Sequence, residues 1–250
     1  YGYGHREEFV EAGCDLFVDS VSDLYGLLGL EEPKEQGYFI SFEGNDGSGK
    51  STQARLLAQR LKQSGYNVLL TREPGGTMVG EQIREVLLKR DNSDMEHLTE
   101  ALLYAAARAQ HVREVIRPAL NDGKHVLCDR FSDATFAYQA AGRGLDFHFI
   151  KTVNDYCAQQ LKPDLTLLFD LPVETGLQRA GRRDAQLKDP SVADRFEKEK
   201  IDFHNRVRQG YLKICSSDPG RFQVIDAARS VDEVAADVSR HVMAFINQQK

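Results

Sequence analysis

Residues 38–65 combine an apolar strand, a glycine-rich loop and an amphipathic helix in direct succession. The loop sequence GNDGSGKS, at positions 44–51, satisfies the pattern G-x-x-x-x-G-K-[ST]. Glycines let such a backbone curl around an anion, and the following helix offers unpaired N–H groups and the positive end of its dipole. This stretch therefore predicts a phosphate-binding loop, and it restricts the chain to an α/β fold of the P-loop NTPase type.

The rest of the chain repeats this alternation of strand and helix. Short apolar segments, each followed by a segment with helical spacing, occupy 38–43, 67–72, 125–130, 164–170 and 222–226. Such alternation is typical of a parallel sheet that is covered on both faces. We therefore expect a five-stranded parallel sheet flanked by helices. The segment 98–120 has the spacing of one long helix that ends before an Asn-Asp-Gly turn.

The main domain is expected to extend over 37–250, after the charged linker sequence EEPKEQG. Within this domain, the segment 181–194 is polar and charged and contains Pro190. We expect this segment to be an exposed, mobile lid between two helices.

Residues 1–36 precede that domain. Within residues 1–30, the segments REE, AGCD and VDS loosely resemble the C-terminal end of a haloacid-dehalogenase-type phosphatase. The nucleophilic and metal-binding aspartates of that family are not among these residues. We expect an inactive remnant of an upstream phosphatase-like domain, and an unrelated terminal extension is the alternative.

Composition narrows the range of partners. The formal net charge of −6 argues against an extended nucleic-acid-binding surface. The longest apolar runs, such as LTLLFDLP, are too short to cross a bilayer. The scattered cysteines form no C-x-x-C pair, which favours reduced thiols and a cytoplasmic location. We therefore expect neither a nucleic acid nor a membrane as partner.

The phosphate loop predicts a site for ATP and Mg²⁺. In such loops the lysine, here Lys50, reaches the β and γ oxygens, and the hydroxyl of Ser51 is offered to Mg²⁺. The predicted ATP-binding residues of the loop are Gly44, Asn45, Asp46, Gly47, Ser48, Gly49, Lys50, Ser51 and Thr52. Switch GTPases, motor ATPases and small-molecule kinases all use this loop. The sequence lacks the N-K-x-D motif of GTPases, which favours a kinase, while a nucleotide-dependent switch remains the alternative.

Three further motifs predict a second substrate. TREPGGT begins at Thr71, YAAAR at Tyr104 and DRFSDATFAYQAAGRG at Asp129. Two of them follow predicted strands, and ligands of open parallel sheets bind beyond the carboxyl ends of the strands. Each motif supplies an arginine, and the second also supplies an aromatic ring one helical turn away. Because guanidinium groups clamp phosphate and aromatic rings stack on bases, a nucleoside monophosphate fits this set.

Together these motifs resemble those of bacterial-type thymidylate kinases over about residues 38–247, with TREPGGT and AYQ…GRG as the most specific parts. The resemblance implies Mg²⁺-dependent transfer of the γ-phosphoryl group of ATP to dTMP, giving dTDP for dTTP synthesis. It also implies a homodimer. A kinase for another pyrimidine deoxynucleotide, or for a nucleoside, is the closest alternative.

The resemblance implies a role for each dTMP-binding position. The implied positions are Asp46, Arg72, Glu73, Pro74, Tyr104, Arg108, Arg130, Thr135, Tyr138 and Phe196. Arg72 and Arg130 would hold the 5′-phosphate. Tyr104, where the family usually has Phe, would stack on thymine, and Arg108 would bond the base. Asp46 would orient the 3′-OH, while Tyr138 and Phe196 would border the sugar.

The family also implies the catalytic groups. Lys50 and Arg130 would act at the phosphates, the lid arginines Arg182 and Arg183 would stabilise the transferring phosphoryl group, and Arg179 would lie against adenine. Asp129 would hold Mg²⁺ through water, with Ser51 as the direct ligand; a salt bridge from Asp129 to Arg130 is an equal alternative. The sequence departs from the family at Ala134 and at Ala140–Ala141, where Ser and Gly-Gly are common.

Overall fold

The computed structural model describes residues 37–184, 196 and 199–248. The predicted N-terminal extension and most of the predicted lid lie outside the described residues. No helix in the described ranges is both long enough and apolar enough to span a bilayer.

A parallel sheet forms the centre of the fold, in the order β2-β3-β1-β4-β5. The strands are β1 (Phe39–Glu43), β2 (Val68–Arg72), β3 (His125–Asp129), β4 (Leu165–Asp170) and β5 (Phe222–Asp226). The predicted five-stranded parallel sheet is thus confirmed, with strand ends within one residue of those expected. In the register, Asp129 pairs with both Phe42 and Arg72. The carboxyl ends of β1, β2 and β3 therefore lie side by side.

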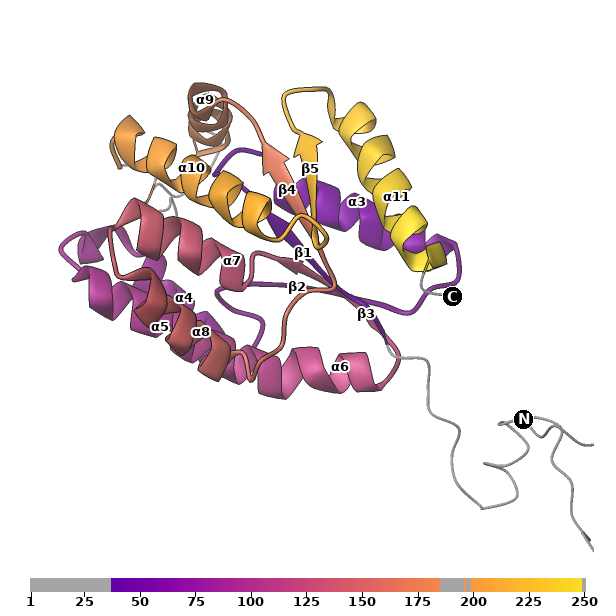
Figure 1. Ribbon diagram of the computed structural model, residues 1–250, viewed down its shortest axis with the longest axis horizontal. Helices are drawn as coiled ribbons and strands as arrows, with labels where there is room; N and C mark the ends of the chain where they lie inside the picture. The colour runs from indigo at the N-terminus through magenta and orange to yellow at the C-terminus, as the bar shows by residue number, and fades with distance from the viewer. Residues whose placement is uncertain (1–36, 185–195, 197–198, 249–250) are drawn as a thin grey trace, which may run out of the picture. The chain divides into compact units, whose positions relative to one another are not determined.

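Helices cover both faces of the sheet (Figure 1). The α-helices are α3 (Lys50–Gln63), α4 (Met78–Leu88), α5 (His97–His111), α6 (Arg117–Asn121), α7 (Ser132–Thr135), α8 (Phe147–Cys157), α9 (Val173–Asp184), α10 (Ile201–Ser217) and α11 (Val231–Gln248). A 3₁₀ turn, η1 (Arg90–Asn92), and two π-helical turns, η2 (Val112–Ile116) and η3 (Phe136–Gly142), complete the set. α3 and α11 pack on one face, and α5, α6 and α10 on the other.

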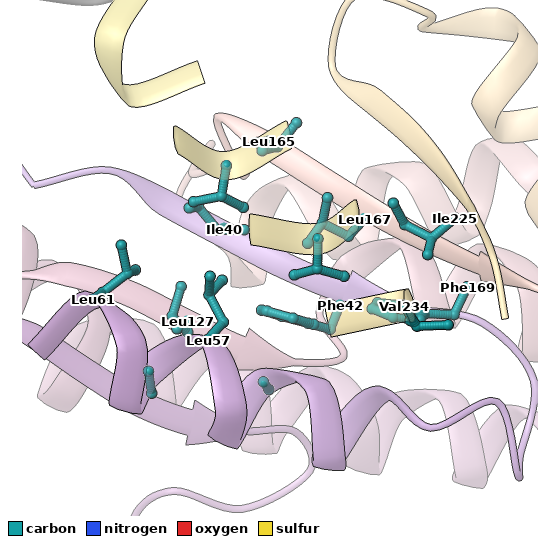
Figure 2. Close-up of a cluster of buried hydrophobic side chains, with 14 of the residues drawn as sticks. Ile40, Phe42, Leu57, Leu61, Leu127, Leu165, Leu167, Phe169, Ile225 and Val234 are labelled. Atoms are coloured by element: carbon teal, nitrogen blue, oxygen red, sulfur yellow. The ribbon is translucent and has the colours of Figure 1, made fainter. Parts of the chain in front are cut away.

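The core on the α3 side shows why α3 forms where it does. Its apolar residues recur at helical spacing, and Leu57 and Leu61 face Ile40 and Phe42 of β1 (Figure 2). Each such buried side chain contributes about 1.5–3 kcal/mol relative to an exposed one. This packing fixes the start of α3, and with it the phosphate loop, against the central strand.

The predicted helix over 98–120 is present, with an interruption. α5 runs into the π turn η2 and then into α6, whose first turn contains Pro118. Proline has no N–H to donate to the preceding turn, so the hydrogen-bond ladder shifts locally. The helix ends at the predicted Asn121-Asp122-Gly123 turn.

The start of the predicted lid differs from expectation. α9 continues to Asp184, so the first four residues of the 181–194 segment are helical. Alanine, arginine and glutamine are good helix formers, and one glycine within a helix costs only about 1 kcal/mol. The polar composition of this segment therefore did not end the helix at Gly181. The remainder, 185–194, lies outside the described residues.

Candidate nucleotide-binding site

The phosphate loop joins β1 to α3 through backbone that only glycine adopts readily. Gly47 has φ 73° and Gly49 has φ 90°. A Cβ atom at Gly47 would lie 2.0 Å from the carbonyl oxygen of Gly176 in α9. Lys50 folds back over the loop and donates to the carbonyl of Asn45 at 2.8 Å. The loop is thus a preformed ring of backbone around a buried ammonium group.

Burial governs the charge of Lys50. Desolvation, together with the nearby Arg130 guanidinium, lowers its pKa from 10.5 to about 8, although the carboxylates of Asp46, Asp129 and Glu43 act in the opposite direction. A bound anion would restore the charged form. Lys50 is therefore an anion site whose affinity depends on pH near 8.

Ser51 and Asp129 meet at the first turn of α3. The Ser51 hydroxyl donates to Oδ2 of Asp129, at the end of β3. Both groups are hard oxygen donors, the kind that Mg²⁺ prefers. In the described ranges no group of three or more acidic, His or Cys side chains is placed to hold a metal. The pair thus fits Mg²⁺ only if phosphate and water complete the coordination shell, which is usual for Mg²⁺.

Asp46, Arg130 and Tyr138 form a compact polar cluster beside the loop. Arg130 Nη2 donates to Asp46 Oδ1 at 2.6 Å and to the Tyr138 hydroxyl at 2.9 Å, and Tyr138 donates to Asp46 Oδ2 at 3.0 Å. Burial disfavours the charged form of Asp46, but Arg130 and Lys50 outweigh it and lower its pKa to about 2. The carboxylate is ionised throughout the physiological range. The ion pair of Arg130 in the described structure is made with Asp46, which favours the metal role for Asp129.

Two residues that were not predicted support Arg130 from behind. Its Nη1 donates to the Tyr211 hydroxyl at 3.2 Å, and Tyr211 donates to Glu43 Oε2 at 2.8 Å. Burial raises the pKa of Glu43 to about 8, and the carboxylate of Asp133 adds to the shift. Arg130 itself has φ 71°, in the left-handed region. Tyr211 ends the sequence RVRQGY at 206–211, which does not by itself mark it as a partner of Arg130. Glu43 is set apart only by its place directly before the loop.

The three predicted arginines do not all reach the same hollow. Arg72 is half exposed and makes two bonds to Glu81, at 2.8 and 3.0 Å. Arg108 is buried and donates to Glu73 at 2.8 Å, to Asn154 at 2.6 Å and to a backbone carbonyl. The other oxygen of Glu73 lies 3.1 Å from Nδ1 of His111. The observed contacts of Arg108 therefore hold the loop after β2, and its predicted bond to the base stays a prediction.

A cavity of about 620 Å³ joins the loop to the second-substrate motifs. The predicted residues that line it are Asp46, Gly47, Gly49, Lys50, Ser51, Thr52, Arg72, Glu73, Pro74, Tyr104, Asp129, Arg130, Thr135, Tyr138, Arg179 and Phe196. The Oγ1 atom of Thr135 is buried and has no hydrogen-bond partner in the described structure. Thr135 lines the cavity, but its hydroxyl oxygen is enclosed by protein and does not open onto it.

The other predicted residues lie around this cavity. Gly44, Asn45 and Ser48 belong to the loop but not to the cavity wall. Arg179 lines the wall and donates to the carbonyls of Ala227 and Ala228.

Of the lid arginines, Arg182 is exposed on α9. Arg183 belongs to the same helix, and its side chain lies outside the description.

The wall also contains residues that the prediction missed. Arg84 of α4 donates to the carbonyl of Pro74 at 2.9 Å, and Gln139 is buried in η3. Arg55, one turn after Ser51, also lines the cavity. Gln139 is part of the AYQ motif, so the sequence could have identified it as a residue of the site. Arg84 and Arg55 look like ordinary charges of an amphipathic helix, and the sequence alone does not set them apart.

Comparisons with known proteins agree on one family. The family model described as thymidylate kinase matches residues 42–238. The thymidylate kinase of Pelobacter propionicus is 50% identical over 207 residues, which cover 83% of this chain and 94% of that protein. That of Syntrophotalea carbinolica is 53% identical over 197 residues, covering 79% and 91%. The crystal structure of thymidylate kinase from Ehrlichia chaffeensis superposes with a TM-score of 0.65 at 34% identity, covering 83% of this chain and 99% of that one.

Proposed function

The chain belongs to the thymidylate kinase family, whose members phosphorylate dTMP, and from this premise we propose how its own residues divide the work. ATP and dTMP bind in the same cavity, with the phosphate loop on the donor side and the motifs after β2 and β3 on the acceptor side. The observation that carries this proposal is that one cavity is lined by Lys50, Arg72, Arg130 and Tyr104.

On the donor side, the backbone N–H groups of the loop surround the β- and γ-phosphates, and Lys50 neutralises them. Ser51 and Asp129 would hold Mg²⁺, which would supply positive charge to neutralise the phosphates. Arg179 lies at the adenine end, where its bonds to two carbonyls fix its direction.

On the acceptor side, Arg72 and Arg130 bind the 5′-phosphate of dTMP. Thymine stacks on Tyr104 and lies beside Thr135. Glu73 and Pro74 form the wall after β2, and Arg108 holds that wall through Glu73.

The sugar lies between Asp46, Tyr138 and Phe196. The rings of Tyr138 and Phe196 meet edge to face, with their centroids 5.6 Å apart, and leave little room beside the sugar. This crowding disfavours a ribose 2′-OH.

No general base is required. A phosphate monoester has its second pKa near about 6, so the attacking oxygen of dTMP is already largely ionised at neutral pH. Asp46, whose pKa is lowered to about 2 by Arg130 and Lys50 against the effect of burial, is too weak a base to help. Its role is to orient the 3′-OH. Catalysis then consists of alignment and charge neutralisation, to which Arg182 and Arg183 contribute from α9.

We also propose a cytoplasmic homodimer. The outer face of α5 presents Leu98 and Leu102 one turn apart, both more than 40% exposed. Val79 and Val86 form a similar stripe on the neighbouring α4. Apolar stripes on adjacent helices are typical of an interface between copies of a chain.

The test is an assay of ADP release with ATP and each of dTMP, dUMP, dCMP and thymidine. We expect dTMP to give the highest kcat/KM. We also expect Arg130→Lys, which cannot make the bidentate contact, to lose at least about tenfold in kcat/KM for dTMP. Arg113→Lys, a change at an exposed arginine of η2, serves as the control.

Release of ADP at a rate indifferent to every acceptor would instead indicate a nucleotide-dependent switch. A preference for another acceptor would indicate the related kinase.

A further inference from the structure

Behind the wall of the cavity lies a carboxylate that the proposed mechanism does not use. Glu100 of α5 is fully buried, and it accepts from the side-chain amide of Gln139 at 2.8 Å. Arg143 donates to both of its oxygens, at 3.3 and 3.1 Å. Arg143 is fixed in turn by an ion pair with Glu199 at 2.5 Å and by the ring of Phe203, 4.5 Å from its guanidinium carbon.

This arrangement allows the amide of Gln139 only one orientation. Glu100 is the carboxylate partner of the Arg143 guanidinium group, and a carboxylate can accept hydrogen bonds but cannot donate them. The NH₂ group of Gln139 must therefore face Glu100. Turning the amide over would set its oxygen against a buried carboxylate, with no proton between them. The oxygen, on the other arm of the amide, is left for a ligand.

The pyrimidine bases fall into two classes at the edge that such an oxygen would meet. Thymine and uracil carry a donor, N3–H, next to the acceptor O4. Cytosine has the reverse order, an acceptor at N3 next to the N4 amino donor. A glutamine that is free to turn over could match either edge, whereas a glutamine held in one orientation matches one.

We propose that Glu100, held by Arg143, is a specificity-determining positioning residue: it fixes Gln139 so that its amide oxygen accepts from N3–H of the acceptor base. The inference rests on the proposed binding of the base beside Tyr104 and Thr135. Glu100 touches no substrate and acts through Gln139. Cytosine nucleotides are rejected because their N3 lone pair faces the same oxygen.

The test is Glu100→Gln, a change of one atom that lets residue 100 donate as well as accept. Gln139 can then turn over and meet cytosine. We expect the ratio of kcat/KM for dCMP to that for dTMP to rise at least tenfold, since a mismatched buried polar pair supports discrimination of that size or more. The ratio for dUMP to dTMP should stay constant, because uracil and thymine share the N3–H edge. Glu85→Gln, at an exposed acid of α4, is the matched control.

A merely structural defect would lower kcat/KM for all three acceptors in parallel. If the ratio of kcat/KM for dCMP to that for dTMP stays within threefold of the wild-type ratio in a folded variant, the inference is overturned. If thermal unfolding shows that Glu100→Gln does not fold, the wild-type protein decides with N3-methyl-dTMP. We expect at least a hundredfold loss in kcat/KM, and use of this compound as readily as dTMP would overturn the inference. Failure of the wild type to phosphorylate dTMP at all would instead refute the proposed function.

Discussion

Lys50 shows how a single residue couples the site to pH. Its ammonium group is buried, and that burial lowers its pKa to about 8, with Arg130 adding to the shift. Bound phosphates would raise this pKa again, because negative charge favours the protonated form. Lys50 therefore makes its full contribution to phosphate affinity below pH 8, where it is already protonated before the ligand binds. This contribution is lost as the pH rises above 8 towards the higher pKa of Lys50 in the complex.

We predict that the Kd for ATP rises by about tenfold for each pH unit above 8, until the pKa of the complex is reached. Isothermal titration calorimetry between pH 7 and pH 9.5 measures this Kd. The same titrations in buffers of different ionisation enthalpy detect the proton that is taken up on binding. The Lys50→Arg variant keeps its positive charge over this range, so its Kd should not change with pH. Its affinity at pH 7 should be lower than that of the wild type. A wild-type Kd that does not change between pH 8 and 9.5 would contradict the assignment.

Tyr104 and Arg108 show what the sequence can and cannot predict about a single side chain. The spacing of Tyr104 and Arg108 puts both on one helical stripe, and both were expected at the base. In the structure Tyr104 lines the cavity, whereas Arg108 points into the core towards Glu73 and Asn154. Which partners each side chain meets depends on the elements that pack against α5, and helical periodicity does not encode that packing.

Among the elements, α9 comes unusually close to the phosphate loop. A Cβ atom at Gly47 would lie 2.0 Å from the Gly176 carbonyl oxygen, and one at Gly176 would lie 2.7 Å from the Asp46 carbonyl oxygen. The two glycines thus let backbone meet backbone. The backbone of α9 therefore occupies the space that a side chain at position 47 would need. Arg179 and Arg182, two of the arginines proposed to act at the nucleotide, follow Gly176 on this helix at three-residue intervals.

We predict that Gly176→Ala lowers kcat/KM for ATP by at least about tenfold, because the new methyl group must push α9 away from the loop. Overpacking of this kind typically costs about 1–3 kcal/mol in the free energy of unfolding. Gly181→Ala in the same helix is the matched control, since no atom lies within 4 Å of its Cβ position. That variant should keep its activity and gain up to about 1 kcal/mol in stability.

Both quantities can be obtained from steady-state kinetics and urea denaturation. Equal effects of the two substitutions would show that the contact between α9 and the loop is unimportant.

The elements themselves were largely predictable. Buried parallel strands read as short apolar runs, and all five appear within a residue of their expected ends. Two details were not predictable from composition: the π turn η2, which follows from the missing N–H of Pro118, and the extension of α9 to Asp184. Both depend on how hydrogen bonds are redistributed around a particular residue, which polarity alone does not show.

At the scale of the whole molecule, the outer faces of α4 and α5 carry exposed apolar side chains. These helices lie together at one side of the molecule, away from α3 and α11 (Figure 1). Leu102 is 47% exposed at the centre of the α5 stripe. Leu98 lies one helical turn from Leu102, and a dimer in which a second copy buries both leucines would be stabilised by the apolar area removed from water.

We predict that Leu102→Asp converts the protein to a monomer, because burial of an unpaired carboxylate in the interface is unfavourable. Sedimentation velocity of wild type and variant measures this. Val231→Asp is the control, since Val231 is 54% exposed at the start of α11 on the opposite face of the sheet. A wild-type protein that sediments as a monomer, or a Leu102→Asp variant that remains a dimer, would exclude this face as the interface.

The ionised Asp46 also decides which nucleotides are refused. Breakdown of nucleic acid releases nucleotides with a phosphate on the 3′ carbon as well as the 5′ carbon. With the sugar placed as proposed, that extra phosphate would face a buried carboxylate that already bonds Arg130 and Tyr138, and the two like charges would repel. In that arrangement such blocked nucleotides would be refused before any ATP is spent on them. The site would then admit only building blocks that a polymerase can still extend.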